Sequence, residues 1–203
     1  MNNSLKSFAL LTGTILAGMF GTTVYAADVE TYEFAGGEVS PAKAAPRIDL
    51  VDQDGQPFSL EQLEGNVVLL YFGYATCPDL CPTTLSDFTA VNEALGEKAD
   101  RVKYVMVSVD PDRDTSARLK EYLAFFDPAF IGVRGDQAQT ELVKREYGVV
   151  ATRVDYPDSA VGYLVDHTSL IYVIDKDGKF RLTYSYGTDP TVIVPDIQHL
   201  LSE

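Results

Sequence analysis

The sequence predicts an α/β fold in which a central mixed sheet is flanked by helices. Two continuous apolar runs, residues 67–72 and 102–109, have the length and composition of strands that are buried on both faces. A helical pattern follows each run, and a β-hairpin pattern with a last helix closes the sequence. A chain of 203 residues with 46% hydrophobic residues can fill one core.

The other elements follow in alternating order. The predicted helices cover residues 81–98, 115–126 and 137–147, with a last helix after Pro190, and the remaining predicted strands cover 130–133, 169–174 and 180–186. Residues 48–51 and 57–60 flank the turn signal at Asp52 to Gly55 and predict a small hairpin ahead of the main sheet. This order is typical of a thioredoxin-like sandwich, here with an extra N-terminal β-hairpin.

Residues 1–26 have the pattern of a signal peptide. Lys6 is followed by an apolar run over residues 8–20 and by Val24-Tyr25-Ala26, which suits cleavage before Ala27. The run is shorter than the roughly 20 residues that cross a bilayer. We therefore expect an exported protein of the bacterial periplasm that is soluble after cleavage, and an uncleaved N-terminus that anchors it to the membrane is the alternative.

Two further segments lack a sustained period. Residues 27–46 contain Gly36-Gly37 and two prolines and indicate a linker or a loosely held arm, so the domain is expected to cover residues 47–203. Residues 150–166 separate a helix from a buried strand with little apolar periodicity. Loops of this length in compact domains are usually functional or disordered.

The charge of the chain limits its partners. A formal net charge of -14 and a sequence pI near 4.4 argue against nucleic acid or an anionic membrane as the main partner, because both would repel the protein. A cationic partner or a metal fits better, and solubility alone is the alternative explanation.

The two cysteines of the chain lie where a buried strand leads into a helix. Pro82 would clash with the carbonyl of Pro78 inside one regular helix, so the helix should begin near Leu80 or Cys81, with Cys77 in the entering loop. A helix N-terminus favours thiolates, which bind soft metals and exchange with disulfides. A structural disulfide is the alternative, although closing so short a loop removes little chain entropy.

His167 is the third candidate ligand, at the start of a buried strand. In thioredoxins a cis-proline just before the corresponding strand touches the dithiol, so this position is aimed at the cysteines. Asp166 has two possible roles: it orients the loop or the imidazole, or it is a solvated surface acid. His199 is expected on the surface. Two thiolates and an imidazole suit Cu(I), and also Cu(II) if a further ligand joins, whereas structural zinc normally needs four protein ligands.

The chain resembles the Sco/SenC family of copper proteins, which take part in assembling cytochrome c oxidase, over residues 46–201. The resemblance rests on three motifs: Tyr71-Phe72-Gly73-Tyr74 followed by Cys77-Pro78-Asp79-Leu80-Cys81-Pro82; Val107-Ser108-Val109-Asp110-Pro111-Asp112-Arg113-Asp114-Thr115; and Asp166-His167-Thr168. It implies copper ligation by Cys77, Cys81 and His167. The second motif is expected to serve turn and helix capping, with Asp114 or Thr115 as the N-cap. Many relatives are tethered to a membrane, which is not carried over here.

Three functions remain open from the sequence. The resemblance implies a copper metallochaperone that delivers one copper to the copper-receiving subunit of cytochrome c oxidase or to another periplasmic copper carrier. A thiol-disulfide oxidoreductase that reduces cysteines of such a partner is the second, and a peroxidase-like or redox-signalling protein is the third. His167 favours the first, whereas a peroxidase would need a cation close to Cys77, where the sequence has no Arg or Lys nearby. We also expect residues 150–166 to become ordered when copper ties His167 to the cysteines.

Overall fold

The computed structural model describes residues 32–203, and it contains the elements expected from the sequence near their predicted positions. The helices are α1 (Leu80–Leu95), α2 (Ser116–Leu123), α3 (Gln137–Glu146) and α4 (Pro190–Ser202), with the short 3-10 helices η1 (Leu60–Leu63) and η2 (Gly96–Arg101). The strands are β1 (Gly37–Ala44), β2 (Asp49–Asp52), β3 (Pro57–Ser59), β4 (Val67–Gly73), β5 (Val102–Ser108), β6 (Ile131–Arg134), β7 (Ala151–Tyr156), β8 (Gly162–His167), β9 (Ile171–Ile174) and β10 (Lys179–Tyr184).

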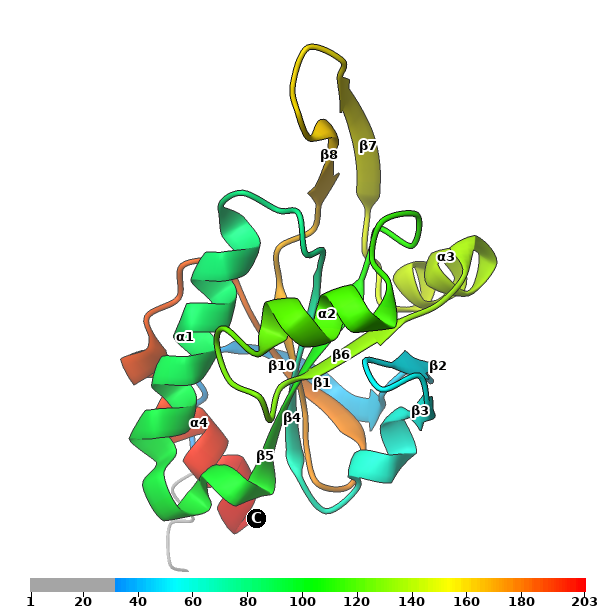
Figure 1. Ribbon diagram of the computed structural model, residues 1–203. Helices are drawn as coiled ribbons and strands as arrows, with labels where there is room; N and C mark the ends of the chain where they lie inside the picture. The colour runs from blue at the N-terminus through cyan, green and yellow to red at the C-terminus, as the bar shows by residue number, and fades with distance from the viewer. Residues whose placement is uncertain (1–31) are drawn as a thin grey trace, which may run out of the picture. The chain divides into compact units, whose positions relative to one another are not determined.

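Eight of these strands form one mixed sheet in the order β1-β10-β9-β4-β5-β6-β2-β3 (Figure 1). β4 pairs in parallel with β5, and β5 with β6, whereas the other neighbours in the sheet are antiparallel. The predicted N-terminal hairpin is formed by β2 and β3, and it extends the same sheet because β2 pairs with β6. The predicted α/β, thioredoxin-like fold class is confirmed.

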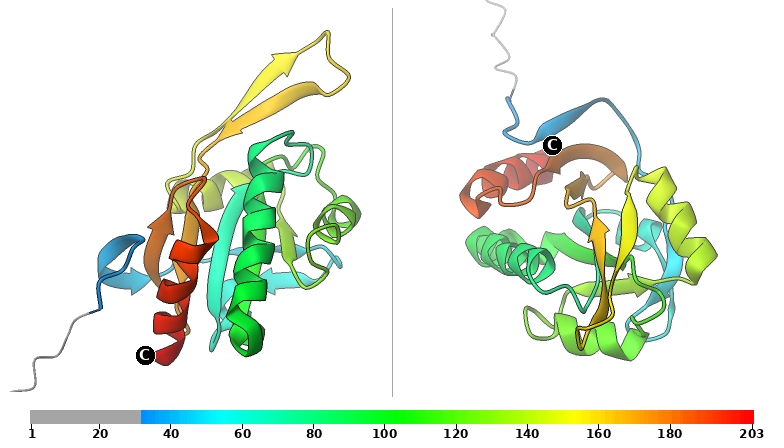
Figure 2. Two further views of the ribbon diagram at one scale, coloured as in Figure 1. Left: turned by 90° about the vertical axis from the view of Figure 1, so that its left-hand side faces the viewer. Right: turned by 90° about the horizontal axis from the view of Figure 1, so that it is seen from above.

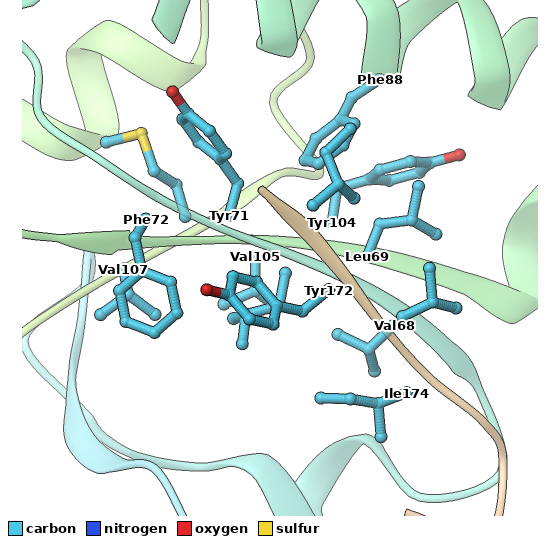
Figure 3. Close-up of a cluster of buried hydrophobic side chains, with 14 of the residues drawn as sticks. Val68, Leu69, Tyr71, Phe72, Phe88, Tyr104, Val105, Val107, Tyr172 and Ile174 are labelled. Carbon is cyan, nitrogen blue, oxygen red and sulfur yellow. The ribbon is translucent and has the colours of Figure 1, made fainter. Parts of the chain in front are cut away.

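The core lies around β4 and β5, whose apolar runs are buried as their sequence predicts. Every residue of β4 is buried. Figure 3 shows Leu69 and Tyr71 on one side of the sheet and Phe72 and Val107 on the other, as the alternation of side chains along a strand requires. The pairing runs from Val67 to Gly73, so the chain that carries the cysteines leaves the sheet at the carboxyl end of its central strand.

The helices cover this sheet through apolar faces. In α1 the buried residues recur every three or four positions along the helix: Cys81, Thr84, Leu85, Phe88, Val91 and Leu95. α1 lies beside α4 (Figure 2), and α2 packs against β6. Gly148 has a φ of +68°, which suits the predicted stop after α3. Thr115, one of the two predicted candidates, caps α2 by accepting a hydrogen bond from the Arg118 backbone N–H.

The segment predicted as a linker or arm takes part in the sheet. Its second half forms β1, which pairs with β10 in antiparallel fashion. The compact unit begins at Glu33, so the domain boundary expected at Arg47 lies inside the folded unit. β1 lacks an apolar period because almost all of its residues are exposed at the edge of the sheet.

Residues 150–166 are not a structureless loop, and that expectation is wrong. β7 and β8 form an antiparallel hairpin in register from Ala151 opposite His167 to Tyr156 opposite Gly162. This hairpin is a separate two-stranded sheet that extends beyond the larger one (Figure 1). His167 is its last residue and therefore sits at the base of the hairpin, next to the body of the domain.

Within residues 32–203, no helix combines the length and the apolarity that crossing a membrane requires. The predicted signal peptide over residues 1–26, its cleavage and its alternative role as an anchor lie outside the described residues.

Candidate metal centre

Cys77, Cys81 and His167 meet at one point, as the sequence predicts. Each offers one ligand atom, and the three atoms all lie within 4.8 Å of one another. Bonds of about 2.0–2.3 Å from an ion to nitrogen and sulfur hold ligands roughly 3.5–4 Å apart, so small side-chain movements would close this set on an ion. In the described part of the chain, no other cluster of three such residues has this spacing.

The loop after β4 and the first turn of α1 place the two sulfurs. Asp79 occupies the N-cap position, so Cys77 precedes the helix and Cys81 lies in its first turn. Cys77 Sγ accepts a hydrogen bond from the Cys81 backbone N–H at 3.4 Å. Pro82 is tolerated because the first helical residues have no partner for their N–H groups within the helix. This geometry stabilises negative charge on Cys77.

The two thiols have opposite properties. The Cys81 thiol donates to Cys77, which, together with His167 and backbone N–H groups, lowers the pKa of Cys77 to about 4 although burial opposes the shift. Burial and the neighbouring Cys77 raise the pKa of Cys81 well above its usual range. Cys77 is half-buried, whereas Cys81 is fully buried. The free protein therefore presents an accessible thiolate backed by a buried thiol.

The tautomer of His167 is set by its own main chain. Nδ1 lies 3.0 Å from the Thr168 carbonyl oxygen, which can only accept, so Nδ1 carries a proton. Nε2 is the ring nitrogen that faces the sulfurs, 3.6 Å from Cys81 Sγ. Tyr71 and Tyr74 contact the imidazole edge-on, with ring centroids 5.9 and 5.8 Å away, and limit its rotation.

Residues of the Tyr71-Phe72-Gly73-Tyr74 motif pack around the site in ways that the sequence did not predict. The Tyr71 hydroxyl donates to Cys81 Sγ at 3.6 Å. A Cβ at Gly73 would lie 2.7 Å from Tyr71 Cε1 and 3.0 Å from Cys81 Sγ, so glycine is needed there. Side chains alternate between the two faces of a strand, and these four residues end a buried strand. This alternation is the sequence signal that could have identified Tyr71 and Gly73 as neighbours of the site.

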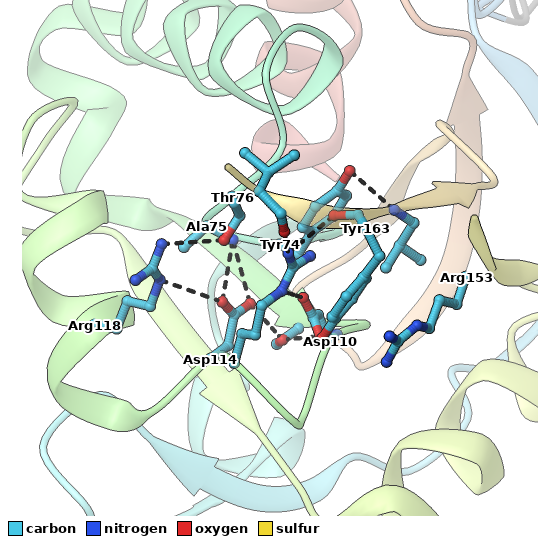
Figure 4. A network of polar contacts seen from close by, with 12 residues as sticks. Tyr74, Ala75, Thr76, Asp110, Asp114, Arg118, Arg153 and Tyr163 are labelled. Carbon is cyan, nitrogen blue, oxygen red and sulfur yellow. Dashed lines mark hydrogen bonds and ion pairs between the residues drawn. The ribbon is translucent and has the colours of Figure 1, made fainter. Parts of the chain in front are cut away.

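The motif at residues 107–115 supports the cysteine loop, as Figure 4 shows. Asp114 is completely buried and accepts hydrogen bonds from the Ser108 hydroxyl and from the Ala75 backbone N–H. Burial raises its pKa, while the Ser108 hydrogen bond opposes that shift. Asp114 thus anchors the loop two residues before Cys77. The sequence offered Asp114 or Thr115 as the N-cap of the following helix. Because Thr115 is that N-cap, Asp114 has a different role.

The two remaining candidates lie apart from the ligand set. Asp166 is exposed on β8, which fits the solvated surface acid that the sequence left open. His199 lies in α4, where its ring contacts Phe34 and its Nε2 is 3.5 Å from a Glu203 oxygen. A cavity of about 330 Å³ opens onto the ligand set, between the cysteine loop and β8, and its lining includes Tyr74, Asp79 and Leu164.

Comparison with known proteins identifies the family. The SCO1/SenC family model matches residues 37–202, from the first residue of β1 into the last turn of α4. The chain belongs to the SCO1/SenC family.

This SCO1/SenC chain has similar relatives of known sequence and structure. It is 38% identical over 146 residues to a SCO2-like protein of Rickettsia felis, covering 72% of this chain and 71% of that one. The structure of Bradyrhizobium japonicum ScoI with copper bound has 38% identity and a TM-score of 0.71, covering 78% of this chain and all of that one. Apo Sco1 of Thermus thermophilus has 34% identity and a TM-score of 0.74, and the match covers 85% of this chain and 99% of that one.

Proposed function

We propose that this protein binds one copper ion through Cys77, Cys81 and His167 and delivers it during assembly of the copper centre of a respiratory cytochrome c oxidase. The observation that carries the proposal is the convergence of two sulfurs and one imidazole nitrogen within 4.8 Å, beside an open cavity. The copper in the related Bradyrhizobium japonicum ScoI supports it.

The donor set favours copper over other metals. Thiolate sulfur is a soft ligand that selects Cu(I), and imidazole allows Cu(II) to be held as well. Structural zinc would normally take four protein ligands. We therefore propose Cu(I) as the main cargo, with Cu(II) bound when His167 takes part.

The different protonation of the two cysteines suits capture and release. Cys77, with a pKa near 4, is a thiolate at neutral pH and can bind an arriving ion at once. Cys81 releases its proton to solvent as it becomes the second sulfur ligand. A receiving protein can approach through the cavity beside Cys77 and His167. Its own thiolates can replace these two ligands before the buried Cys81 dissociates from the ion.

Anaerobic titration of the reduced protein with Cu(I), followed by X-ray absorption, tests the proposal. One equivalent should bind, with sulfur and nitrogen ligation. Cys77→Ala and Cys81→Ala should each weaken binding by more than about a hundredfold, which exceeds the loss usual for a residue outside the ligand set. His199→Ala is the matched control and should bind normally. Unchanged affinity in either cysteine variant contradicts the proposal.

Delivery is tested separately, by mixing the copper-loaded protein with the reduced copper-binding domain of an oxidase subunit. Copper should move to that domain, and the released protein should again show two free thiols. Retention of copper against an excess of reduced receiver contradicts delivery while leaving copper binding intact.

A thiol-disulfide oxidoreductase is the second candidate, favoured by an accessible thiolate of low pKa next to a buried thiol. Cys77 could attack a partner disulfide and Cys81 could then resolve the mixed disulfide, leaving the partner with two thiols and this protein with a Cys77–Cys81 disulfide. Absence of copper at one equivalent, together with reversible oxidation of the pair, would select this function over the first.

A further inference from the structure

The hairpin that carries His167 does not belong to the large sheet. β7 and β8 pair with each other, and neither is among the neighbours in the eight-stranded sheet. The cysteines, in contrast, sit at the end of β4 in the centre of that sheet. The distance between imidazole and sulfurs therefore depends on how the hairpin is held against the body of the domain.

Arg113 supplies much of that attachment. Its Nη1 donates to the backbone carbonyl of Val161, just before β8, at 3.1 Å and to that of Tyr163, in β8, at 2.9 Å. Its Nε donates to an Asp110 carboxylate oxygen at 2.5 Å, and that aspartate is 3% exposed. One guanidinium thus links a buried carboxylate of the body to two carbonyls of the hairpin.

Tyr163 completes the contact. The Arg113 guanidinium carbon lies 3.5 Å from the Tyr163 ring centroid, and the Tyr163 hydroxyl donates to the other Asp110 oxygen at 2.7 Å. Further along β8, the backbone N–H of Val165 donates to the Tyr74 hydroxyl at 3.1 Å. Arg113, Asp110 and Tyr163, which we call the latch, hold one end of β8, and Tyr74 holds its middle.

The latch and the ligand share one face of the strand. Side chains alternate along a strand, so Tyr163, Val165 and His167 point to the same side. A slip of β8 by one residue would turn His167 away from the cysteines. Fixing Tyr163 against Arg113 therefore fixes the face on which His167 is presented.

We propose, building on the proposed copper function, that Arg113 is a positioning residue that holds His167 within reach of Cys77 and Cys81. Without it, the dithiol remains and the imidazole no longer has a fixed place. The planar fork of arginine bridges a carboxylate and two carbonyls while stacking on a ring, which the single ammonium of lysine cannot do.

Amide hydrogen exchange of the metal-free protein, read by NMR, tests the latch independently of copper. In Arg113→Gln, the amides of residues 161–167 should exchange at least about tenfold faster. Val165 reports whether the loosening reaches the middle of β8, because its N–H donates to Tyr74 in the body of the domain. Arg153→Gln is the matched control. Arg153 also stacks on Tyr163, at 3.8 Å, but it donates a hydrogen bond to Asp155 on its own strand. Equal exchange in wild type and Arg113→Gln overturns the latch.

Copper binding tests the consequence for His167. Arg113→Gln should lower Cu(II) affinity by about tenfold or more and shift the Cu(II) absorption and EPR signals toward those of His167→Ala, while Cu(I) stays bound by the two thiolates. The double variant should bind Cu(II) no more weakly than His167→Ala alone. Additive losses in the double variant, or wild-type Cu(II) signals in Arg113→Gln, overturn the positioning role.

Two further variants keep the test decisive. If Arg113→Gln does not fold, Tyr163→Phe removes only the hydroxyl that donates to Asp110 and should produce the same changes to a smaller extent. Arg113→Lys keeps the positive charge and should behave like Arg113→Gln, because the fork is what the latch uses; full rescue by lysine contradicts this. If wild type binds no copper, the proposed function fails, and the exchange experiment still decides whether the latch exists.

Discussion

The space left at Gly73 decides where Cys81 can lie. Because this residue has no side chain, the first turn of α1 can bring Cys81 Sγ to within 3.0 Å of where a Cβ would stand, with the Tyr71 ring on the other side. Cys81 is thereby completely buried beneath Cys77, and this burial raises its pKa. The glycine therefore contributes to the difference between the two thiols by allowing Cys81 to be buried.

We expect Gly73→Ala to disturb the metal site as well as the fold. The added methyl group must displace Cys81 or Tyr71, at a cost of about 1–3 kcal/mol of unfolding free energy. Cu(I) titration should show weaker binding. Gly132→Ala is the control, because its Cβ would lie 2.7 Å from Leu123 Cδ1, away from the ligand set. It should destabilise the fold to a similar degree without changing copper affinity, and equal copper binding by both variants would contradict the role of Gly73.

The convergence of Cys77, Cys81 and His167 could be predicted from the sequence, whereas the residues that hold these side chains in place could not. Cys77 and Cys81 follow an apolar run and precede a helical pattern, so local rules place them. Arg113 acts on carbonyls 48 and 50 residues away, and no local pattern links such distant segments. The residues that support the site through tertiary contacts could therefore be identified only from the structure.

At the scale of secondary-structure elements, the β7–β8 hairpin was likewise not predictable from local sequence patterns. Its residues are mostly exposed or partly buried without alternation, and only Val165 is buried, so the apolar period is weak. β4 and β5 were predicted because burial on both faces demands continuous apolar residues. β1 and the hairpin were missed because strand pairing at an edge needs few apolar side chains.

Copper should change the dynamics of this hairpin. A bond from His167 to the metal ties the end of β8 to α1, in addition to the latch at its start. Amide exchange in residues 150–167 should therefore be slower in the copper-loaded protein than in the apo protein. Residues 131–134 in β6 serve as the internal reference. Identical exchange of the hairpin in the two forms would show that copper does not restrain it.

At the scale of the whole molecule, Asp196 joins the N-terminal part of the domain to its last helix. This carboxylate is 1% exposed and accepts hydrogen bonds from the backbone N–H groups of Ala35, at 3.0 Å, and Gly36, at 2.9 Å. It also accepts one from the Tyr184 hydroxyl at 2.7 Å. The start of β1, β10 and α4 are thereby held together at one buried group.

Asp196→Asn should destabilise the protein without changing copper binding. The amide oxygen can take the place of Oδ2, but a neutral acceptor forms weaker hydrogen bonds than a carboxylate, and the NH₂ replaces the Oδ1 that lies 3.3 Å from the Ala35 backbone nitrogen. The expected cost is about 1–2 kcal/mol of unfolding free energy. Urea unfolding should show a lower midpoint. Asp177→Asn, at an exposed carboxylate 3.5 Å from Lys179, is the control and should unfold like wild type. A wild-type midpoint for Asp196→Asn would mean that this anchor contributes little.

The position of β1 also bears on how the protein behaves at high concentration. A strand at the edge of a sheet offers unpaired N–H and C=O groups on which a strand of another molecule can add, which leads to aggregation. β1 forms one edge, and its register is interrupted between Glu38 and Lys43, where Pro41 has no N–H to donate. The other edge, β3, has only three residues. Neither edge offers a long, regular template, so strands of other copies of the protein do not readily add to this sheet.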